Sequence, residues 1–171
     1  MLQGLSKFSL DGVSGSNIKS VQSGTLTTSL FAASYDVGIS NVDVLKSIIT
    51  AISDKSFLSE QYLPSFTNST TINFGSISAG STTALKWNVT EFNNVKSKQQ
   101  RNVSIVANTV TDISISAIDT QKYLLIAHIA GTDNTNAGSS ARWYYSLKNS
   151  NTIELFSVYA GTIAWQLLEF N

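Results

Sequence analysis

The chain has no cysteine, a single proline and a single histidine among its 171 residues. Without cysteine it can form no disulfide bond, no thiolate zinc site and no cysteine nucleophile. Charge is also scarce, because only 13% of the residues are charged and the formal net charge is zero. A nucleic-acid or anionic-membrane binder depends on a long-range field that this composition does not supply, so we expect neither kind of partner.

Long apolar runs are missing as well. No run approaches the roughly 18 residues that are needed to span a membrane. The opening segment, MLQGLSKFSLDGVSGSN, lacks the basic start and apolar stretch of a secretory signal. We therefore expect the chain to be made in a cytoplasm and exported, if at all, by assembly or lysis. Residues 1–17 form an N-terminal arm, interpreted either as a docking arm or as an edge strand or frayed terminus, and we favour the second.

Apolar and small polar side chains are abundant. Hydrophobic residues make up 42% of the chain, and Ser, Thr and Asn together make up about a third. A core can therefore form beneath a surface solvated by hydroxyl and amide groups, which is typical of β-rich proteins. Disorder is the rival interpretation of so much polarity, but the apolar and aromatic content argues against it.

The chain is built as a tandem repeat. Its last seven residues, WQLLEFN at 165–171, nearly recur as WNVTEFN at 87–93. Three further blocks recur in the same order and at a nearly constant offset: residues 18–22 at 95–99, 39–46 at 115–122 and 68–72 at 149–153. Repetition of several blocks in order indicates a duplicated structural unit. We therefore predict one module at 18–94 and a second at 95–171, after the N-terminal arm.

The closing segments have the period of a strand. One face of the first carries Leu85, Trp87 and Val89, and the same face of the second carries Ile163, Trp165 and Leu167. Alternation with polar residues predicts that these side chains face the core.

Other segments also favour strands. Residues 122–130 are apolar on both faces, which predicts a central strand, and residues 46–53 are their counterpart. A short helix over 42–53 is the alternative, but its β-branched residues favour a strand. Pro64 cannot donate a hydrogen bond to a strand neighbour and so predicts an edge strand. Asp43 and Asp119 each precede a strand and predict Asx-turns.

Together these patterns predict an all-β fold made of two tandem small antiparallel β-sandwich or jelly-roll-like modules. Each module would hold five to seven short strands with regularly spaced turns. Modules of about 77 residues are near the lower limit for independent stability, so we expect them to pack on each other or to oligomerise. A single sandwich built from both copies stays open as an alternative.

The repeated motifs resemble a small β module of bacteriophage virion proteins, found in tail fibres, receptor-binding tips and head-decoration proteins. The motifs are K-S-x-Q, I-S-x-[VI]-D-x-x-K, N-S-x-T-I and W-x-[VL]-x-E-F. The first copy matches at Lys19, Gln22, Asp43, Lys46, Asn68, Thr71, Trp87, Glu91 and Phe92. The second copy matches at Lys96, Gln99, Asp119, Lys122, Asn149, Thr152, Trp165, Glu169 and Phe170.

This resemblance implies a non-enzymatic structural protein on the outside of a phage particle, made in the host cytoplasm. It would serve as a head decoration, a fibre or a tail accessory, with capsid or tail proteins as partners. We expect a homo-oligomer and favour a trimer. The resemblance brings no catalytic residues, and the matched positions are interpreted as determinants of strands and turns.

Catalytic candidates are few. His128 has no cysteine and no second histidine beside it, so we expect no metal site and no cofactor. It aligns with Ile52 of the first copy, which favours a packed structural histidine over a general base. Glu91 and Glu169 occupy the same place in different copies, whereas paired acid–base carboxylates belong to one site. We interpret each glutamate as bonded to a backbone amide or to a lysine, with Lys46 and Lys122 as candidates.

The best candidate for recognition is the polar, glycine-rich stretch 131–140 and the aromatic residues after it. A sugar site needs planar aromatic faces together with amide and carboxylate groups. The ligand-binding candidates are Asp133, Asn134, Asn136, Arg142, Trp143 and Tyr144. A carbohydrate- or receptor-binding module that recognises a host surface glycan is thus the alternative function. Calcium could also use Asp133, although one carboxylate is few.

A plainer interpretation of the same region is an exposed hairpin loop, and we favour it. In that interpretation Trp143, Tyr145 and Leu147 face the core, as Tyr62, Pro64 and Phe66 would in the first copy. Between the copies, Lys96, Lys98 and Arg101 form a small basic cluster, interpreted as a solvated linker.

Overall fold

The computed structural model describes residues 17–28, 34–53, 62–76, 84–131 and 143–171. These residues form β-strands and one short 3-10 turn, and they contain no α-helix. The all-β prediction is therefore confirmed. Within the same residues no helix is long and apolar enough to cross a membrane.

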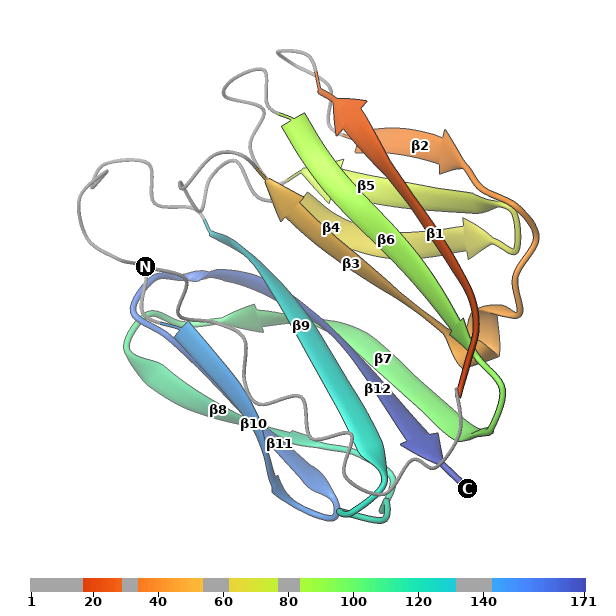
Figure 1. The fold of residues 1–171 in the computed structure, drawn as a ribbon. Helices are drawn as coiled ribbons and strands as arrows, with labels where there is room; N and C mark the ends of the chain where they lie inside the picture. Colours follow the sequence, from red (N-terminus) through yellow and green to blue (C-terminus); the bar gives the residue numbers. More distant parts are fainter. Residues whose placement is uncertain (1–16, 29–33, 54–61, 77–83, 132–142) are drawn as a thin grey trace.

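The strands fall into two sets of six that follow one another along the chain (Figure 1). The first module comprises β1 (Ile18–Thr27), β2 (Ser34–Gly38), the turn η1 (Val44–Lys46), β3 (Ser47–Ser53), β4 (Tyr62–Asn68), β5 (Thr71–Ser76) and β6 (Ala84–Phe92). The second module comprises β7 (Val95–Ile105), β8 (Thr109–Ser114), β9 (Tyr123–Gly131), β10 (Trp143–Asn149), β11 (Thr152–Ser157) and β12 (Gly161–Phe170).

Each module is a pair of three-stranded antiparallel sheets with the same strand order. The first module has the sheets β1-β6-β3 and β2-β5-β4, and the second has β7-β12-β9 and β10-β11-β8. Every strand of the second module thus occupies the place of the strand six positions earlier, and among the described residues no sheet mixes strands from the two sets. The closing segments of the sequence are β6 and β12, the central strands of their sheets.

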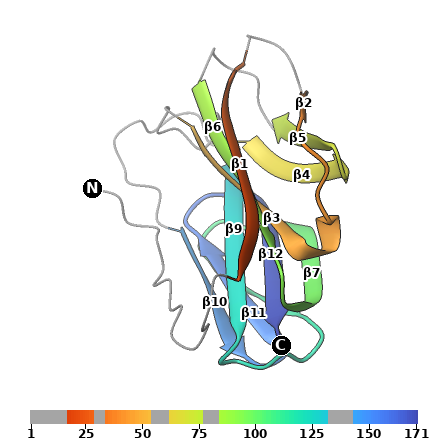
Figure 2. The same ribbon diagram turned by 45° about the vertical axis from the view of Figure 1, so that its right-hand side comes forward.

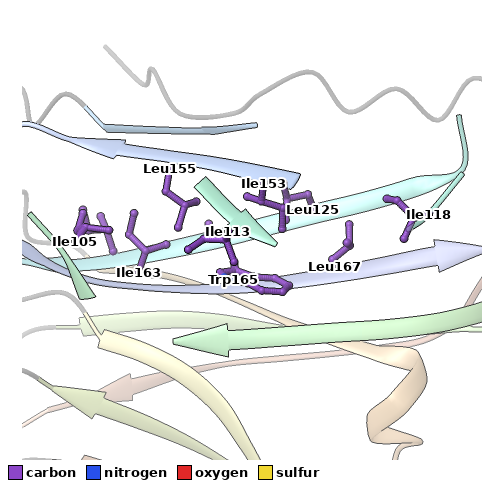
Figure 3. Close-up of a cluster of buried hydrophobic side chains, with 11 residues drawn as sticks. Ile105, Ile113, Ile118, Leu125, Ile153, Leu155, Ile163, Trp165 and Leu167 are labelled. Carbon is purple, nitrogen blue, oxygen red and sulfur yellow. The ribbon is translucent and has the colours of Figure 1, made fainter. Parts of the chain in front are cut away.

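The core of each module lies between its two sheets. In the second module Ile163, Trp165 and Leu167 of β12 pack with Ile153 and Leu155 of β11 (Figure 3). The equivalent cluster of the first module joins Leu85, Trp87 and Val89 to Ile72 and Phe74. The predicted core faces of the closing strands are confirmed, because period-two alternation puts one face of each strand inside.

The prediction of a central strand at residues 122–130 is wrong. β9 is an edge strand, and so is its counterpart β3. β9 is apolar on both faces because Leu124 and Ile126, on the outer face of its sheet, pack against the first module. A strand that is apolar on both faces is buried on both faces. The pattern does not show whether it is central in its sheet or, as here, an edge strand covered by another module.

Local features of the chain agree with the sequence. Pro64 lies in β4, an edge strand as predicted. The Asp43 Oδ1 atom accepts a hydrogen bond from Leu45 N–H at 3.0 Å, and Asp119 Oδ1 accepts one from Gln121 N–H at 2.9 Å. Both Asx-turns are confirmed. The helical alternative is restricted to the single turn η1, after which β3 begins.

The two modules pack edge on face. Figure 1 shows β6 and β12 pointing the same way, and Figure 2 shows β3 beside β9 and β12. At one end of this contact Ile48, Phe92 and Leu168 are buried together. The rings of Phe92 and Phe170 meet edge to face with centroids 5.4 Å apart. These two phenylalanines are equivalent residues of the repeated motif, so the motif also supplies part of the contact between modules.

Candidate functional site

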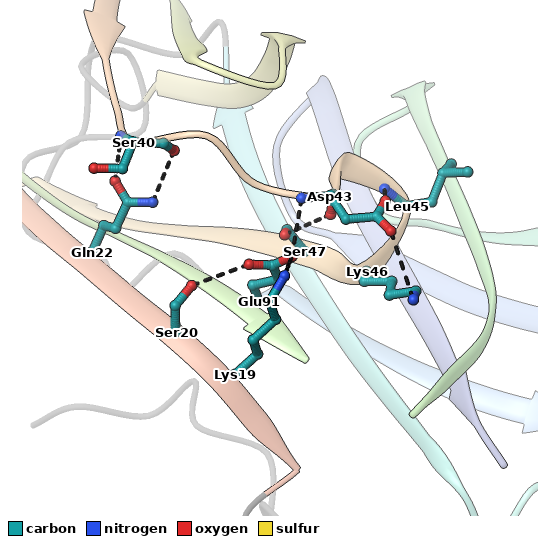
Figure 4. A network of polar contacts seen from close by, with 9 residues as sticks. All are labelled: Lys19, Ser20, Gln22, Ser40, Asp43, Leu45, Lys46, Ser47 and Glu91. Carbon is teal, nitrogen blue, oxygen red and sulfur yellow. Dashed lines mark hydrogen bonds and ion pairs between the residues drawn. The ribbon is translucent and has the colours of Figure 1, made fainter. Parts of the chain in front are cut away.

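The repeated polar residues form a clamp around a buried glutamate in the first module (Figure 4). Glu91 is only 2% exposed. Its Oε1 atom accepts hydrogen bonds from Lys19 Nζ at 2.8 Å and from Asp43 N–H at 3.1 Å, and its Oε2 atom accepts one from Ser20 Oγ at 3.2 Å. The clamp therefore fastens the loop that carries Asp43 to the sheet formed by β1 and β6.

The second module contains the same clamp. Glu169 accepts hydrogen bonds from Lys96 Nζ at 2.8 Å, Ser97 Oγ at 3.1 Å and Asp119 N–H at 2.9 Å. Lys46 and Lys122 were the wrong candidates for the lysine partner. The pairing of β1 with β6 is irregular between Ile18 and Ser20, so Lys19 can reach the Glu91 carboxylate although its neighbour Ser20 pairs with the same glutamate.

Both glutamates are held in the ionised form. Burial raises the pKa of Glu91, but the hydrogen bonds from Lys19 and Asp43 outweigh burial and leave that pKa below its usual value. For Glu169 the hydrogen bond from Lys96 is the largest influence, and it likewise lowers the pKa. A carboxylate with its lone pairs committed in this way is a structural anion and a poor general acid.

The glutamine of each motif has a similar task. Gln22 donates to Ser40 O at 3.0 Å and accepts from Ser40 N–H at 2.6 Å. Gln99 makes the same pair of bonds with Ser116, at 3.0 and 2.7 Å. Each glutamine amide thus pairs with the main chain as a strand neighbour would. The motif residues that both copies share are used to hold the fold.

His128 lies in the contact between the modules. Its Nε2 atom accepts a hydrogen bond from Ala51 N–H at 3.1 Å, and its Nδ1 atom is buried with no partner among the described residues. Burial lowers the pKa of His128 to about 4. The imidazole is therefore neutral at pH 7 and belongs to the packing, as a structural histidine.

Two more side chains of the second module bond to the main chain of the first. Gln166 accepts from Ile49 N–H at 3.1 Å and donates to Ile49 O at 2.9 Å. Lys98 Nζ donates to Val44 O at 3.0 Å and to Ser47 O at 2.6 Å. Burial lowers the pKa of Lys98 to about 8, although the charge of Asp43 opposes the shift.

The interpretation of the basic cluster as a solvated linker is wrong. Lys96, Lys98 and Arg101 all lie within the strand β7, and β6 and β7 are separated only by residues 93–94. Lys98 also sits over the ring of Phe66, 4.7 Å from its centroid. Lys98 therefore lies inside a strand and in the contact between the two modules, not in a solvated linker.

The predicted recognition stretch is only partly described. Asp133, Asn134, Asn136 and Arg142 lie outside the described residues. Trp143 and Tyr145 are half-buried against the core of the second module, with their rings stacked at a centroid distance of 5.5 Å. Both therefore face inward, as the plainer interpretation expected. Tyr144 points the other way and is 43% exposed.

Tyr144 belongs to an apolar row on the outer face of the sheet β10-β11-β8. Strand pairing places Phe156 opposite Tyr144, and Val110 opposite Phe156. The rings of Tyr144 and Phe156 are stacked with centroids 5.3 Å apart and an angle of 21° between their planes. Val110 is 49% exposed. This solvent-facing row is therefore apolar across all three strands.

The next row on the same face is polar and charged. It carries Ser146, Glu154 and Asp112 on the three strands. Lys148 Nζ lies 2.7 Å from Asp112 Oδ2 and 3.5 Å from Glu154 Oε2, and Glu154 Oε1 accepts from Tyr144 Oη at 3.1 Å. The hydrogen bond to Asp112 raises the pKa of Lys148. Partial burial, followed by the bond to Glu154, raises the pKa of Tyr144.

These two rows, which we call the aromatic–acidic face, have no counterpart in the first module. Equivalent positions there hold Leu63, Gly75 and Ser34 in the first row and Ser65, Asn73 and Asp36 in the second. Of this face, Tyr144 was predicted from the sequence, whereas Phe156, Glu154, Asp112 and Lys148 were not. The available signal was an aromatic residue on the polar side of an alternating strand, where the other copy has glycine.

No group of three or more His, Cys, Asp or Glu side chains that could hold a metal ion occurs among the described residues. Comparison with known proteins found no family model, no curated protein and no solved structure that matches this chain.

Proposed function

We propose that the chain is a non-enzymatic structural protein on the exterior of a bacteriophage particle, as a head decoration, fibre or tail accessory protein. The observation that carries this proposal is the use of the repeated polar residues. The side chains of Glu91 and Glu169, and of Gln22 and Gln99, bond to the protein's own loops and strands. Side chains committed in this way give rigidity, and the two glutamates are not free to act as acid–base groups.

The joint between the modules supports the same proposal. Gln166, Lys98 and the partly buried His128 are all bonded to main-chain atoms of the first module. Two sandwiches held in one orientation form a rigid building block, in contrast to the mobile linkage that is common between domains.

The test is localisation on particles. Antibodies against the purified chain, used for immunogold electron microscopy of phage particles from cultures that produce it, should label the exterior of intact particles. The chain should also co-sediment with particles after high-salt washing. If it stays in the soluble fraction of the lysate and never labels particles, the proposal is wrong.

A second candidate function, binding of a host surface glycan, is favoured by the aromatic–acidic face. Tyr144 and Phe156 offer apolar ring surface for sugar C–H groups, while Asp112, Glu154 and Lys148 offer polar groups for hydroxyls. Sugar sites combine these two chemistries. The face is confined to the second module, so the function would have been added to one copy of a structural repeat.

An array of bacterial surface polysaccharides tests this second candidate. Binding to at least one polysaccharide should fall more than tenfold in Tyr144→Ala and in Phe156→Ala. Tyr123→Ala is a matched control, because Tyr123 is similarly exposed, 36% against 43% for Tyr144, but lies on β9. Equal loss in the control, or no binding by the parent chain, would exclude the aromatic–acidic face as a glycan site.

A further inference from the structure

The contact between the two modules joins two different surfaces. The first module contributes an edge, formed by η1, β3 and β4, and the second contributes the outer face of the sheet β7-β12-β9. A contact of this kind is heterologous, since each module presents a surface that the other does not use. An equivalent face on the first module, apart from Ile48, and an equivalent edge on the second module take no part in this contact.

The face of the second module supplies one bonding side chain from each strand. These are Lys98 on β7, Gln166 on β12 and His128 on β9. All three bond to main-chain atoms of the opposing edge, at Ser47, Ile49 and Ala51. The edge of β3 is thereby covered by side chains in place of a further strand, which removes the association hazard of an open edge.

The edge of the second module offers the same main-chain groups. Ile49 pairs with Val89 in the first module, and Leu125 pairs with Leu167 in the same register in the second. The N–H and C=O groups of Leu125 therefore point away from β12, as those of Ile49 point away from β6. Among the described residues no side chain bonds to the main chain of Leu125 or of Ala127, the counterpart of Ala51.

The face of the first module carries exposed apolar residues at the matching positions. Val21 stands at the position of Lys98 and is 57% exposed, and Ile52 stands at the position of His128 and is 67% exposed. Between them, Asn88 takes the position of Gln166 and keeps its amide group. Lys86 stands at the position of Ala164 on this face. It could bond to carbonyl groups of a docked edge, as Lys98 does within the chain.

We propose that a second copy of this chain docks the edge of its β9 onto the outer face of β1-β6-β3. This contact would repeat between chains the edge-on-face packing that joins the modules within one chain. It covers Val21 and Ile52 and supplies partners for the main chain of Leu125. Because a heterologous contact leaves a further edge and face, the copies form a closed ring where the rotation closes and a filament where it does not.

The first experiment measures mass in solution. Size-exclusion chromatography with light scattering should give a mass of at least two chains that dissociates on dilution. Ile52→Glu should shift it to a single chain. Val106→Glu is the matched control, because Val106 is also 67% exposed but lies outside this face, and it should leave the mass unchanged. A parent chain that stays monomeric at its highest soluble concentration, or an Ile52→Glu variant that associates like the parent, would overturn the proposal.

The second experiment tests which surfaces meet. Lys98 Nζ is 3.0 Å from Val44 O within the chain, and the equivalent positions between chains are Val21 and Thr120. The chain has no natural cysteine, so single-cysteine variants can be cross-linked cleanly with a short bismaleimide. A mixture of Val21→Cys and Thr120→Cys chains should cross-link at least tenfold faster than either variant alone. Equal or faster cross-linking of Val21→Cys with itself would indicate a face-to-face dimer and would refute the edge-on-face proposal.

Discussion

The two modules share their interior and differ on their surfaces. Inside, Trp87 and Trp165 occupy the same core position, and Glu91 and Glu169 hold the same clamp. Outside, the second module has His128 where the first has Ile52, and Phe156 where the first has Gly75. The core tryptophan and the clamp glutamate are thus the same in both copies, while these two outer-face positions differ in size and chemistry.

One interior difference separates the modules as well. Trp87 lies opposite Gly24, and Trp165 lies opposite Arg101. A Cβ atom on Gly24 would lie 2.6 Å from Trp87 Cζ2, so the indole of the first module occupies space above a glycine. The second module has a side chain on the opposing residue, so its indole packs without that space. The packing of the tryptophan therefore requires a glycine on the opposing strand in the first module only.

The largest expected effect concerns His128, a side chain of the intermodule contact whose ordinary pKa lies close to neutrality. Burial lowers the pKa of His128 to about 4, whereas the unfolded chain would have a value near 6.5. The unfolded state therefore binds more protons between these values, and stability falls as the pH drops from about 6.5 to about 4. Over that pH range we expect the free energy of unfolding to fall by about 3 kcal/mol. Urea unfolding at a series of pH values measures this loss.

His128→Gln sharpens this prediction. Its amide oxygen can still accept from Ala51 N–H but does not titrate, so the slope of stability against pH between 4 and 6.5 should largely disappear. Glu91 and Glu169 have lowered pKa values, so their contribution to stability is lost mainly below pH 4.5, and the slope is best measured between about 4.5 and 6.5. A slope that survives in the variant would show that His128 is not its source.

The next effect tests whether the clamps are equivalent. Glu91→Ala and Glu169→Ala each leave a partly buried backbone N–H, at Asp43 or Asp119, without its acceptor. We expect each change to lower the free energy of unfolding by about 2 kcal/mol. Lys19→Ala, in which the removed side chain is 57% exposed, should cost much less. Unequal losses from the two glutamates would break the equivalence of the modules.

Much of the fold was predictable because the same pattern of apolar and polar residues occurs in both copies of the repeat. Period-two alternation predicted the core faces at Trp87 and Trp165, and the aspartates predicted the turns. The edge position of β9 was not predictable, because an apolar outer face gives the same pattern whether a strand or a module covers it. The clamp lysines were missed because Lys19 and Glu91 are brought together only by the register of β1 with β6.

The candidate site was harder to predict than the fold. Tyr144 drew attention because it follows a polar loop in sequence. Phe156, Glu154 and Asp112 come from two other strands, and only strand pairing places them in adjacent rows with it. Lys98 was predicted to be a surface residue because lysine is charged. Its carbonyl partner Ser47 belongs to the other module and is far away in sequence, so the sequence gives no sign of the contact. Contacts across long sequence separations carry no local signature.

A smaller effect is expected from the glycine that faces Trp87. Gly24→Ala would bring a Cβ atom too close to the indole, and the ring must shift in a filled core. We expect a loss of about 1–2 kcal/mol. Arg101→Ala at the equivalent position should change stability by less than about 0.5 kcal/mol, since a Cβ atom is already accommodated there. Thermal unfolding followed by tryptophan fluorescence checks both variants, and equal losses would contradict the difference between the modules.

The smallest effect on stability is expected at Lys148, which bridges Asp112 and Glu154 on the aromatic–acidic face. The side chains of Lys148 and Asp112 are substantially exposed, at 46% and 48%, whereas that of Glu154 is partly buried, at 23%. Exposed ion pairs contribute little to folding, because water and salt screen them. Lys148→Ala should therefore leave the urea midpoint unchanged, and Asp36→Ala in the first module serves as the matched control. A clear drop in the Lys148 variant alone would assign these charges to folding, and would remove the reason to treat the aromatic–acidic face as a surface kept for binding.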